Sequence, residues 1–91
     1  MTNKDNSIAV IMITLNEAHN LKRVFQNIKD WADEIYILDS YSQDETIDLC
    51  IEHNIKVIQK KFVSFGEQWN YALNAFDVKS TWVMKLDPDE I

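Results

Sequence analysis

The sequence predicts an α/β fold in which a parallel, Rossmann-like sheet carries helices on both faces. Short, continuous apolar runs alternate along the chain with stretches whose apolar residues fall at positions i, i+3, i+4 and i+7. The runs are typical of strands buried on both faces, and the spaced pattern is typical of helices that cover a sheet. Their order, βαβαβαβ, favours parallel strands joined by right-handed crossovers. Apolar residues make up 46% of the chain, with one Gly and one Pro, which indicates a packed core.

The first half of the chain predicts two strands and two helices. Residues 8–13 form an apolar run, and residues 35–38 form a second one. Between them, helical spacing gives one apolar face, made of Leu21, Val24, Phe25 and Ile28. After the second run, a shorter helical pattern carries Ile47, Cys50 and Ile51. Each strand is therefore followed by a helix that packs on the sheet.

The second half of the chain repeats this alternation. Residues 56–59 form a third strand, which is short and flanked by lysine and so belongs near an edge of the sheet. A third helix has its apolar residues at Trp69, Ala72, Leu73 and Phe76. The apolar run over residues 82–86 predicts a fourth strand, which we expect to be buried.

Each predicted helix begins with the pattern of a capping box, in which a Ser or Thr is followed three residues later by Glu. The three boxes are Thr14-x-x-Glu17, Ser42-x-x-Glu45 and Ser64-x-x-Glu67. The first two follow their strands closely, so these helices begin near the carboxyl edge of the sheet, where open α/β sheets bind ligands. Thr14 and Glu17 can therefore act as caps alone or also face a ligand, and the sequence leaves both roles open.

The predicted strand order is 3-2-1-4. Right-handed crossovers favour this order, and it brings the loops after the first and fourth strands together. The fourth strand then lies at an edge, with unpaired backbone groups on its outer side. We therefore expect this edge to be covered by another chain or to cause self-association.

The loop after the first strand, residues 14–17, contains no glycine. Dinucleotide-binding folds and P-loops both need glycines at this point, so that phosphates can approach the helix N-terminus. Both classes are excluded. This loop must instead offer a ligand its backbone edges and its side chains.

Asp39 and Ser40 follow the second strand. An acidic residue at this position can accept hydrogen bonds from a nucleoside, either from ribose hydroxyls or from an N–H of a base. Asp39 can equally bond the backbone of its own turn, and Ser40 needs no ligand to explain it at the start of a helix. The sequence leaves these alternatives open.

Asp87 and Asp89 follow the fourth strand, spaced i, i+2 around Pro88. Carboxylates in this position suit a hard divalent cation such as Mg²⁺ or Mn²⁺, which protein carboxylates commonly hold together with substrate phosphates. Asp-Pro is also a common way to open a turn, so the triplet alone is a weak signal. The stronger indication is that acidic loops follow strands one, two and four at one edge.

Composition excludes several partners. The net charge of −6 gives no electrostatic reason to expect a nucleic acid. The polar start, residues 1–6, lacks the apolar segment of a signal peptide, and no apolar stretch is long enough to span a membrane. We expect Cys50 to be a small buried side chain in a reducing, cytoplasmic environment.

Three motifs together resemble family 2 glycosyltransferases of the GT-A fold, in particular the bacterial branch that acts on lipopolysaccharide core or other surface polysaccharides. They are Val10-Ile11-Met12-Ile13-Thr14-Leu15-Asn16-Glu17, Leu38-Asp39-Ser40-x-Ser42-x-Asp44-x-Thr46 and Leu86-Asp87-Pro88-Asp89-Glu90. The phrase from Phe65 to Leu73 is similar to the helix between strands three and four in that branch. The resemblance covers nearly all of the chain after Ser7 and identifies residues 1–91 as the nucleotide-sugar-binding part of a truncated GT-A domain.

The resemblance implies an inverting transfer of a sugar from a nucleotide donor, most often a uridine diphosphate sugar, to a hydroxyl group of a glycan or lipid-linked acceptor. The implied donor-binding residues are Thr14, Leu15, Asn16, Glu17, Asp39, Ser40 and Asp87. Asp39 would accept from the base. Asp87 would approach the ribose or the metal, and Asp89 would hold Mg²⁺ or Mn²⁺ at the diphosphate. Association of the full enzyme with a membrane surface is a further implication.

The chain departs from the family pattern in two ways. Trp69 stands where the family usually has Arg, so a cationic contact from that position is lost or comes from elsewhere. The general base of an inverting enzyme is expected beyond Ile91, so we assign no catalytic residue and expect the 91 residues alone to be inactive.

The main alternative is a module that binds a nucleotide or nucleotide sugar without turnover, and this alternative fits the 91 residues taken alone. A receiver-type signalling domain would need an Asp after the third strand, where this chain has Gln59-Lys60-Lys61. A sugar nucleotidyltransferase would need a glycine-rich loop after the first strand.

Overall fold

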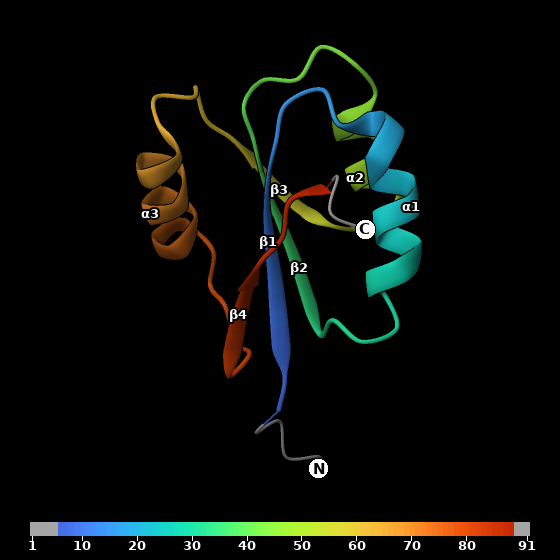
Figure 1. The fold of residues 1–91 in the computed structure, drawn as a ribbon, viewed down its shortest axis with the longest axis vertical. Coiled ribbons are helices and arrows are strands. Elements are labelled where there is room, and N and C mark those ends of the chain that lie inside the picture. The colour runs from blue at the N-terminus through green and yellow to red at the C-terminus, as the bar shows by residue number, and fades with distance from the viewer. Residues whose placement is uncertain (1–5, 89–91) are drawn as a thin grey trace.

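The sheet has four strands, all paired in parallel, in the order β3-β2-β1-β4. The structure is a computed structural model, and it describes residues 6–88 of the chain. The strands are β1 (Ile8–Thr14), β2 (Glu34–Asp39), β3 (Lys56–Gln59) and β4 (Trp82–Lys85) (Figure 1). The predicted fold class and strand order are confirmed.

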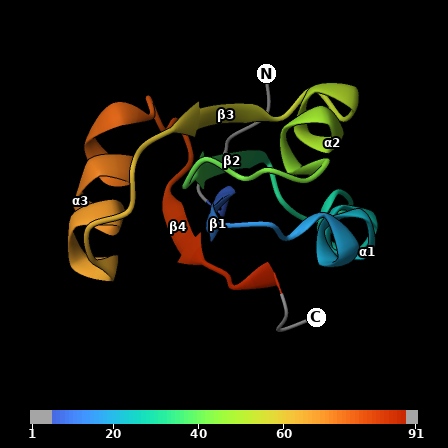
Figure 2. The same ribbon diagram turned by 90° about the horizontal axis from the view of Figure 1, so that it is seen from above.

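Helices cover both faces of the sheet. On one side lie α1 (Ala18–Ile28) and α2 (Thr46–Glu52), and on the other lies α3 (Phe65–Ala75) (Figure 2). The side chains of β1 alternate between two cores. Val10 and Met12 pack with the apolar face of α1, whereas Ala9 and Ile11 pack on the α3 side. A strand with a helix on each face needs apolar residues at every position, which explains the continuous run.

The apolar stripe of α1 is buried as its spacing predicts, and Cys50 of α2 is also buried. Burial, followed by the nearby charge of Asp39, raises the pKa of the Cys50 thiol to about 12. The thiol is therefore protonated near neutral pH and acts as a small apolar side chain.

No helix within residues 6–88 is long and apolar enough to cross a membrane.

The prediction of a buried fourth strand is wrong for the described residues. All four residues of β4 are exposed, among them Trp82 (62%), Val83 (42%) and Met84 (40%). Within residues 6–88 the strand pairs only with β1, so it forms the edge of the sheet, which the predicted order already implies. Ile51 and Leu73 were also predicted to face inward, but both are largely exposed because neighbouring residues of α2 and α3 make the sheet contacts.

Candidate functional site

The loops after β1 and β2 lie at the same end of the sheet because the strands are parallel (Figure 1). They are joined by hydrogen bonds between residues more than twenty positions apart. Three backbone N–H groups at the start of α1 donate to side chains of the second loop: Asn16 to Ser42 Oγ (2.8 Å), Glu17 to Thr46 Oγ1 (3.1 Å) and Ala18 to Asp44 Oδ2 (3.1 Å). The second loop therefore caps the first helix.

Two of the three predicted capping boxes are wrong. The N-cap residues of α1 and α2 are Glu17 and Glu45, and neither caps its helix through its side chain. The hydroxyl of Thr14 instead donates to Asp39 across the sheet edge. The third box is confirmed, since Ser64 Oγ accepts from the N–H of Glu67 at 3.2 Å.

Asp39 is the last residue of β2, and it is fully buried between the carboxyl ends of β1 and β3. Its Oδ1 atom accepts from Thr14 Oγ1 (2.6 Å) and Ser42 Oγ (2.5 Å). Its Oδ2 atom accepts from the N–H of Ser42 (2.7 Å) and from Gln59 Nε2 (3.2 Å). The bond to the Ser42 amide is the turn contact that the sequence allows. A hydrogen bond from a nucleobase would have to replace one of these partners, so the nucleoside role of Asp39 stays a prediction.

Asn16 belongs to the turn between β1 and α1. Its backbone is left-handed, with φ of 54°, and its Oδ1 atom accepts from the N–H of Gln43 at 2.8 Å. Asn is among the non-glycine residues that tolerate this conformation best. The structure therefore gives Asn16 a role in shaping the loop, and its predicted contact with a ligand stays a prediction.

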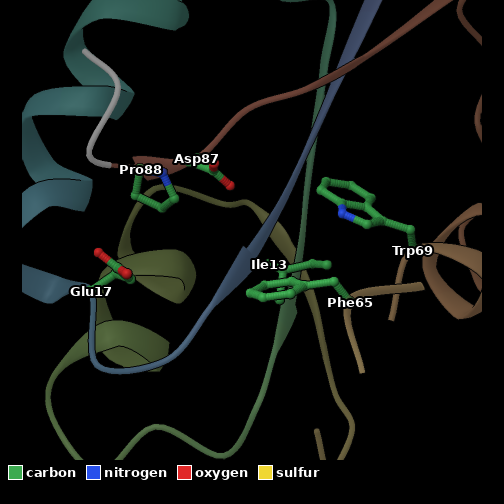
Figure 3. Close-up of a pocket in the computed structure, with 6 residues that line it drawn as sticks. All are labelled: Ile13, Glu17, Phe65, Trp69, Asp87 and Pro88. Carbon is green, nitrogen blue, oxygen red and sulfur yellow. The ribbon is translucent and has the colours of Figure 1, made fainter. Parts of the chain in front are cut away.

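Two cavities adjoin at this edge, and Ile13, Glu17 and Phe65 line both. The larger, of about 430 Å³, is also lined by Trp69, Asp87 and Pro88. Figure 3 shows the rings of Phe65 and Trp69 on one side of this cavity and Glu17 on the other. The fold thus brings the predicted residues Glu17 and Asp87 together from loops about seventy positions apart in the sequence.

The smaller cavity, of about 350 Å³, contains three more of the predicted residues. Its remaining lining is Thr14, Leu15, Ser40 and Phe62. Phe62 and Phe65 pack edge to face, with ring centroids 5.1 Å apart, and form an aromatic wall. This cavity has one carboxylate, that of Glu17, and is otherwise apolar or uncharged.

Sequence reasoning missed the aromatic lining of the site. Phe62, Phe65 and Trp69 all lie between β3 and the middle of α3, and the sequence predicted Trp69 to lie in the core. Trp69 is partly buried against the α3-side core and also lines the larger cavity. The available signal was the position of Phe62 in the loop after β3 and of Phe65 at the first residue of α3, where the chain returns from the carboxyl edge. Lys85 Nζ lies 5.2 Å from the centroid of the Trp69 ring, so a cation approaches the position where the family pattern has Arg.

The metal prediction rests on Asp87 and Asp89, and Asp89 lies outside the described residues. Within residues 6–88, no cluster of three or more His, Cys, Asp or Glu side chains could hold a metal ion. Asp87 and Glu17 offer oxygen atoms, which suit Mg²⁺ and Mn²⁺, but two carboxylates leave most of the coordination shell to other ligands. These residues therefore fit a divalent cation that phosphate oxygens and water help to hold.

Comparison with known proteins identifies the family to which the chain belongs. The chain matches the family described as Glycosyl transferase family 2 over residues 9–91. It is 31% identical over 83 residues to an uncharacterized glycosyltransferase of Rickettsia bellii, covering 91% of this chain and 28% of that protein. It is 30% identical over 82 residues to the SPbeta prophage-derived glycosyltransferase SunS of Bacillus subtilis, covering 88% of this chain and 19% of SunS.

Solved structures show the same fold. Glucosyl-3-phosphoglycerate synthase from Mycobacterium tuberculosis in complex with UDP superposes with a TM-score of 0.77 at 26% identity, covering 93% of this chain and 34% of that one. A structure of that synthase with Mn²⁺, UDP and glucosyl-3-phosphoglycerate gives a TM-score of 0.74 at 24% identity, covering 90% and 33%.

This chain spans less than a third of the length of the two curated relatives. The match nevertheless extends over nearly all of its own residues, in sequence and in fold. The chain belongs to family 2 of the glycosyltransferases.

Proposed function

We propose that this chain binds the nucleotide-sugar donor of a glycosyltransferase that moves a sugar to a hydroxyl acceptor, and that the donor is a uridine diphosphate sugar. The observation that carries the proposal is the pair of adjoining cavities at the carboxyl edge of the sheet. The smaller is mostly apolar or uncharged and is lined by Phe62 and Phe65, which suits a nucleoside. The larger adds Asp87 to the shared Glu17, which suits a cation bound to a diphosphate. The UDP bound to the mycobacterial synthase supports the choice of base.

In this proposal the nucleoside occupies the smaller cavity. Thr14, Leu15 and Ser40 line it, and Leu15 is half exposed, so its backbone and side chain are available to a ligand. Asp39 is not among the lining residues, but its carboxylate accepts from the hydroxyl of Thr14, which is. Gln59 makes the longest of the bonds to Asp39, at 3.2 Å, so it is the partner that a base N–H would replace most easily.

The diphosphate and sugar would then occupy the larger cavity, beside Asp87. Asp87 and Asp89 would hold Mg²⁺ or Mn²⁺ there, together with phosphate oxygens. A bound divalent cation would stabilise the negative charge that develops on the departing nucleoside diphosphate. Glu17, on the opposite side of the cavity, would face the same region and discourage anions that arrive without a cation.

For the whole protein we propose an inverting transferase of bacterial cell-surface glycan synthesis, for example synthesis of the lipopolysaccharide core. Its acceptor would be a glycan or lipid-linked molecule, and the enzyme would work in the cytoplasm at the membrane surface. The acidic general base would lie beyond Ile91. The alternative is a binding module without turnover. It would describe residues 6–88 taken alone, because their cavities would hold the donor and none of these residues is proposed as the general base.

The experiment is a nuclear magnetic resonance titration of the labelled chain with UDP in the presence of Mg²⁺, which avoids paramagnetic broadening. We expect the largest amide shifts at Ile13, Leu15, Ser40 and Phe65, with little change at Lys56 and Asp77 at the opposite edge. Shifts that are confined to the opposite edge, or no shifts at millimolar UDP, would contradict the proposal. Glycosyl transfer by the full-length protein from a UDP-sugar distinguishes the enzyme from the binding module.

A further inference from the structure

We propose that Lys85 binds the diphosphate of the donor, and that the ring of Trp69 positions the Lys85 ammonium group beside the larger cavity. This inference rests on the proposed function, since it names a residue for the same site. It assigns a positively charged contact to a site whose identified charged residues are all acidic.

The position of Lys85 follows from the alternation of side chains along a strand. Lys85 pairs with Ile11 of β1, and Ile11 belongs to the core on the α3 side of the sheet. The Lys85 side chain lies on that same side, because its Nζ atom is 5.2 Å from the centroid of the Trp69 ring in α3. Trp69 in turn lines the larger cavity, so the ammonium group rests against a ring of the cavity wall.

The charges around the larger cavity favour a positively charged side chain beside it, in addition to a divalent cation. Its six lining residues, all within the described part of the chain, include the carboxylates of Glu17 and Asp87 and no Lys or Arg. The whole chain carries a net charge of −6. A nucleoside diphosphate would be repelled by this environment unless nearby positive groups compensated for it, and a single divalent cation offsets only part of the charge of both carboxylates and the diphosphate.

Lys85 is better placed for this role than Lys60, the other lysine that rests on an aromatic ring. Lys60 Nζ donates to the carbonyl of Lys61 at 3.3 Å and lies 5.6 Å from the centroid of the Tyr71 ring. Tyr71 is exposed and lines neither cavity of the site. The ring beneath Lys85 is the one in the cavity wall.

The contact between Lys85 and Trp69 can be exchanged for a contact with phosphate. A cation–π contact at an exposed site is weak, and a charge-assisted hydrogen bond to phosphate is stronger. The four-carbon stem of lysine is flexible, so the ammonium group can turn from the ring towards the cavity while the strand stays in place. Trp69 then acts as a positioning residue that keeps the cation near its ligand.

The test compares the affinities of uridine, UMP and UDP for the wild-type chain and for Lys85→Gln, by calorimetry in the presence of Mg²⁺. We expect Lys85→Gln to weaken UDP binding about tenfold, or ~1.4 kcal/mol, and to leave uridine binding unchanged. Lys85→Arg should keep most of the UDP affinity. Lys56→Gln, which removes the same charge at the opposite edge of the sheet, is the control and should bind UDP as the wild type does.

The contrast between ligands decides the result. Equal weakening of uridine and UDP by Lys85→Gln would indicate a structural role, and unchanged UDP binding would remove Lys85 from the site; either result overturns the inference. Equal losses in Lys85→Gln and Lys56→Gln would also overturn it, because net charge alone would then explain the effect. If the wild-type chain binds no UDP, the proposed function itself falls, which is a separate outcome.

Discussion

Asp39 holds together the loops that shape the candidate site. Its buried carboxylate accepts hydrogen bonds from Thr14, Ser42 and Gln59, which follow or end three neighbouring strands. Asp39→Ala would leave the Thr14 hydroxyl and the Ser42 amide without their acceptor. We expect the free energy of unfolding to fall by about 2–3 kcal/mol, since each buried polar group left unpaired costs roughly 1–3 kcal/mol. Urea denaturation measures this change.

The same variant should bind UDP more weakly with or without metal, because the walls of the nucleoside cavity lose their common anchor. Asp39→Asn is the matched control, since it keeps the shape and one acceptor oxygen, and we expect it to lose less stability. A change below about 0.5 kcal/mol for Asp39→Ala, the range of ordinary surface substitutions, would show that the observed network contributes little.

Asp44 gives the fold a dependence on acid pH. Its Oδ2 atom accepts from the N–H of Ala18, and its Oδ1 atom accepts from the N–H of Thr46 at 2.9 Å, so one carboxylate caps the starts of two helices. Burial alone would raise the pKa of Asp44, but the hydrogen bonds from Thr46 and Ala18 outweigh it and hold the pKa below its usual value.

A carboxyl group whose pKa is lower in the folded state stabilises the fold above its unfolded pKa, and this contribution is lost as the pH falls through the folded pKa. We therefore expect Asp44→Ala to cost about 1 kcal/mol at pH 7, as the loss of a helix cap does. The difference from the wild type should shrink below about pH 4, where the unfolded carboxyl group is protonated. Urea denaturation as a function of pH measures it. A difference independent of pH down to pH 2 would contradict this role, and Asp44→Asn should show a smaller loss that does not titrate.

At the scale of the elements, Glu34 fixes the start of β4. Its carboxylate accepts from the backbone N–H groups of Lys79 (3.0 Å) and Ser80 (2.6 Å) and from the hydroxyls of Ser80 and Tyr36. These contacts lie at the amino edge of the sheet, opposite the candidate site. They join the first residue of β2 to the connection that leads from α3 into β4, and so help to set the position of Asp87 at the far end of that strand.

We expect Glu34→Ala to loosen β4 more than the rest of the sheet. The amide of Trp82 donates to the Ser7 carbonyl at 3.0 Å, and the amide of Leu86 donates to the Ile11 carbonyl at 3.2 Å. Hydrogen exchange at Trp82 and Leu86 should become faster, whereas the amides of the β1–β2 pairing should keep most of their protection. Glu34→Gln, which keeps one acceptor oxygen, is the control. Uniform loss of protection across the sheet would show that Glu34 has no special role in β4.

Local sequence patterns predicted the elements well where the signal and its structural cause lie close together. The alternation of patterns gave the four strands and three helices, and Lys56–Gln59 is the third strand with its predicted bounds. Ser64 caps α3 as its box predicts because its partner is only three residues away. Thr14 and Ser42 carry the same local signal, but both donate to Asp39 instead, Ser42 within its own turn and Thr14 across the sheet edge, 25 residues away. The long-range partner of Thr14 cannot be read from a short motif, and in Ser42 one local partner competes with another.

Part of the site could be predicted from the order of strands and loops. Thr14, Leu15, Glu17, Ser40 and Asp87 follow strands, so the topology alone gathers them at one edge, and they line the two cavities. The place of Trp69 in the cavity lining was missed because this residue has the spacing of a core residue on α3. Its ring is only partly buried and also lines the larger cavity with Asp87 and Pro88.

At the scale of the whole molecule, the edge formed by β4 predicts association. Trp82, Val83 and Met84 are exposed beside a backbone edge that pairs only on its β1 side within the described residues. Such an edge invites pairing with another chain. We expect sedimentation at micromolar concentrations to show dimers or larger species of this chain. Val83→Lys, which places a charge on the edge, should shift the population towards monomers. A monomeric wild type under these conditions would contradict the prediction.

The most direct test of the account is whether UDP and Mn²⁺ bind to this chain cooperatively. Each ligand would complete the site of the other, so calorimetry should show that Mn²⁺ raises the affinity for UDP about tenfold or more, corresponding to coupling of at least ~1.4 kcal/mol. Asp89→Ala should abolish this coupling, whereas Asp39→Ala should weaken UDP binding with or without Mn²⁺. UDP binding that does not depend on metal and is unchanged by Asp89→Ala would contradict the metal role of Asp89 and, with it, the proposed donor chemistry.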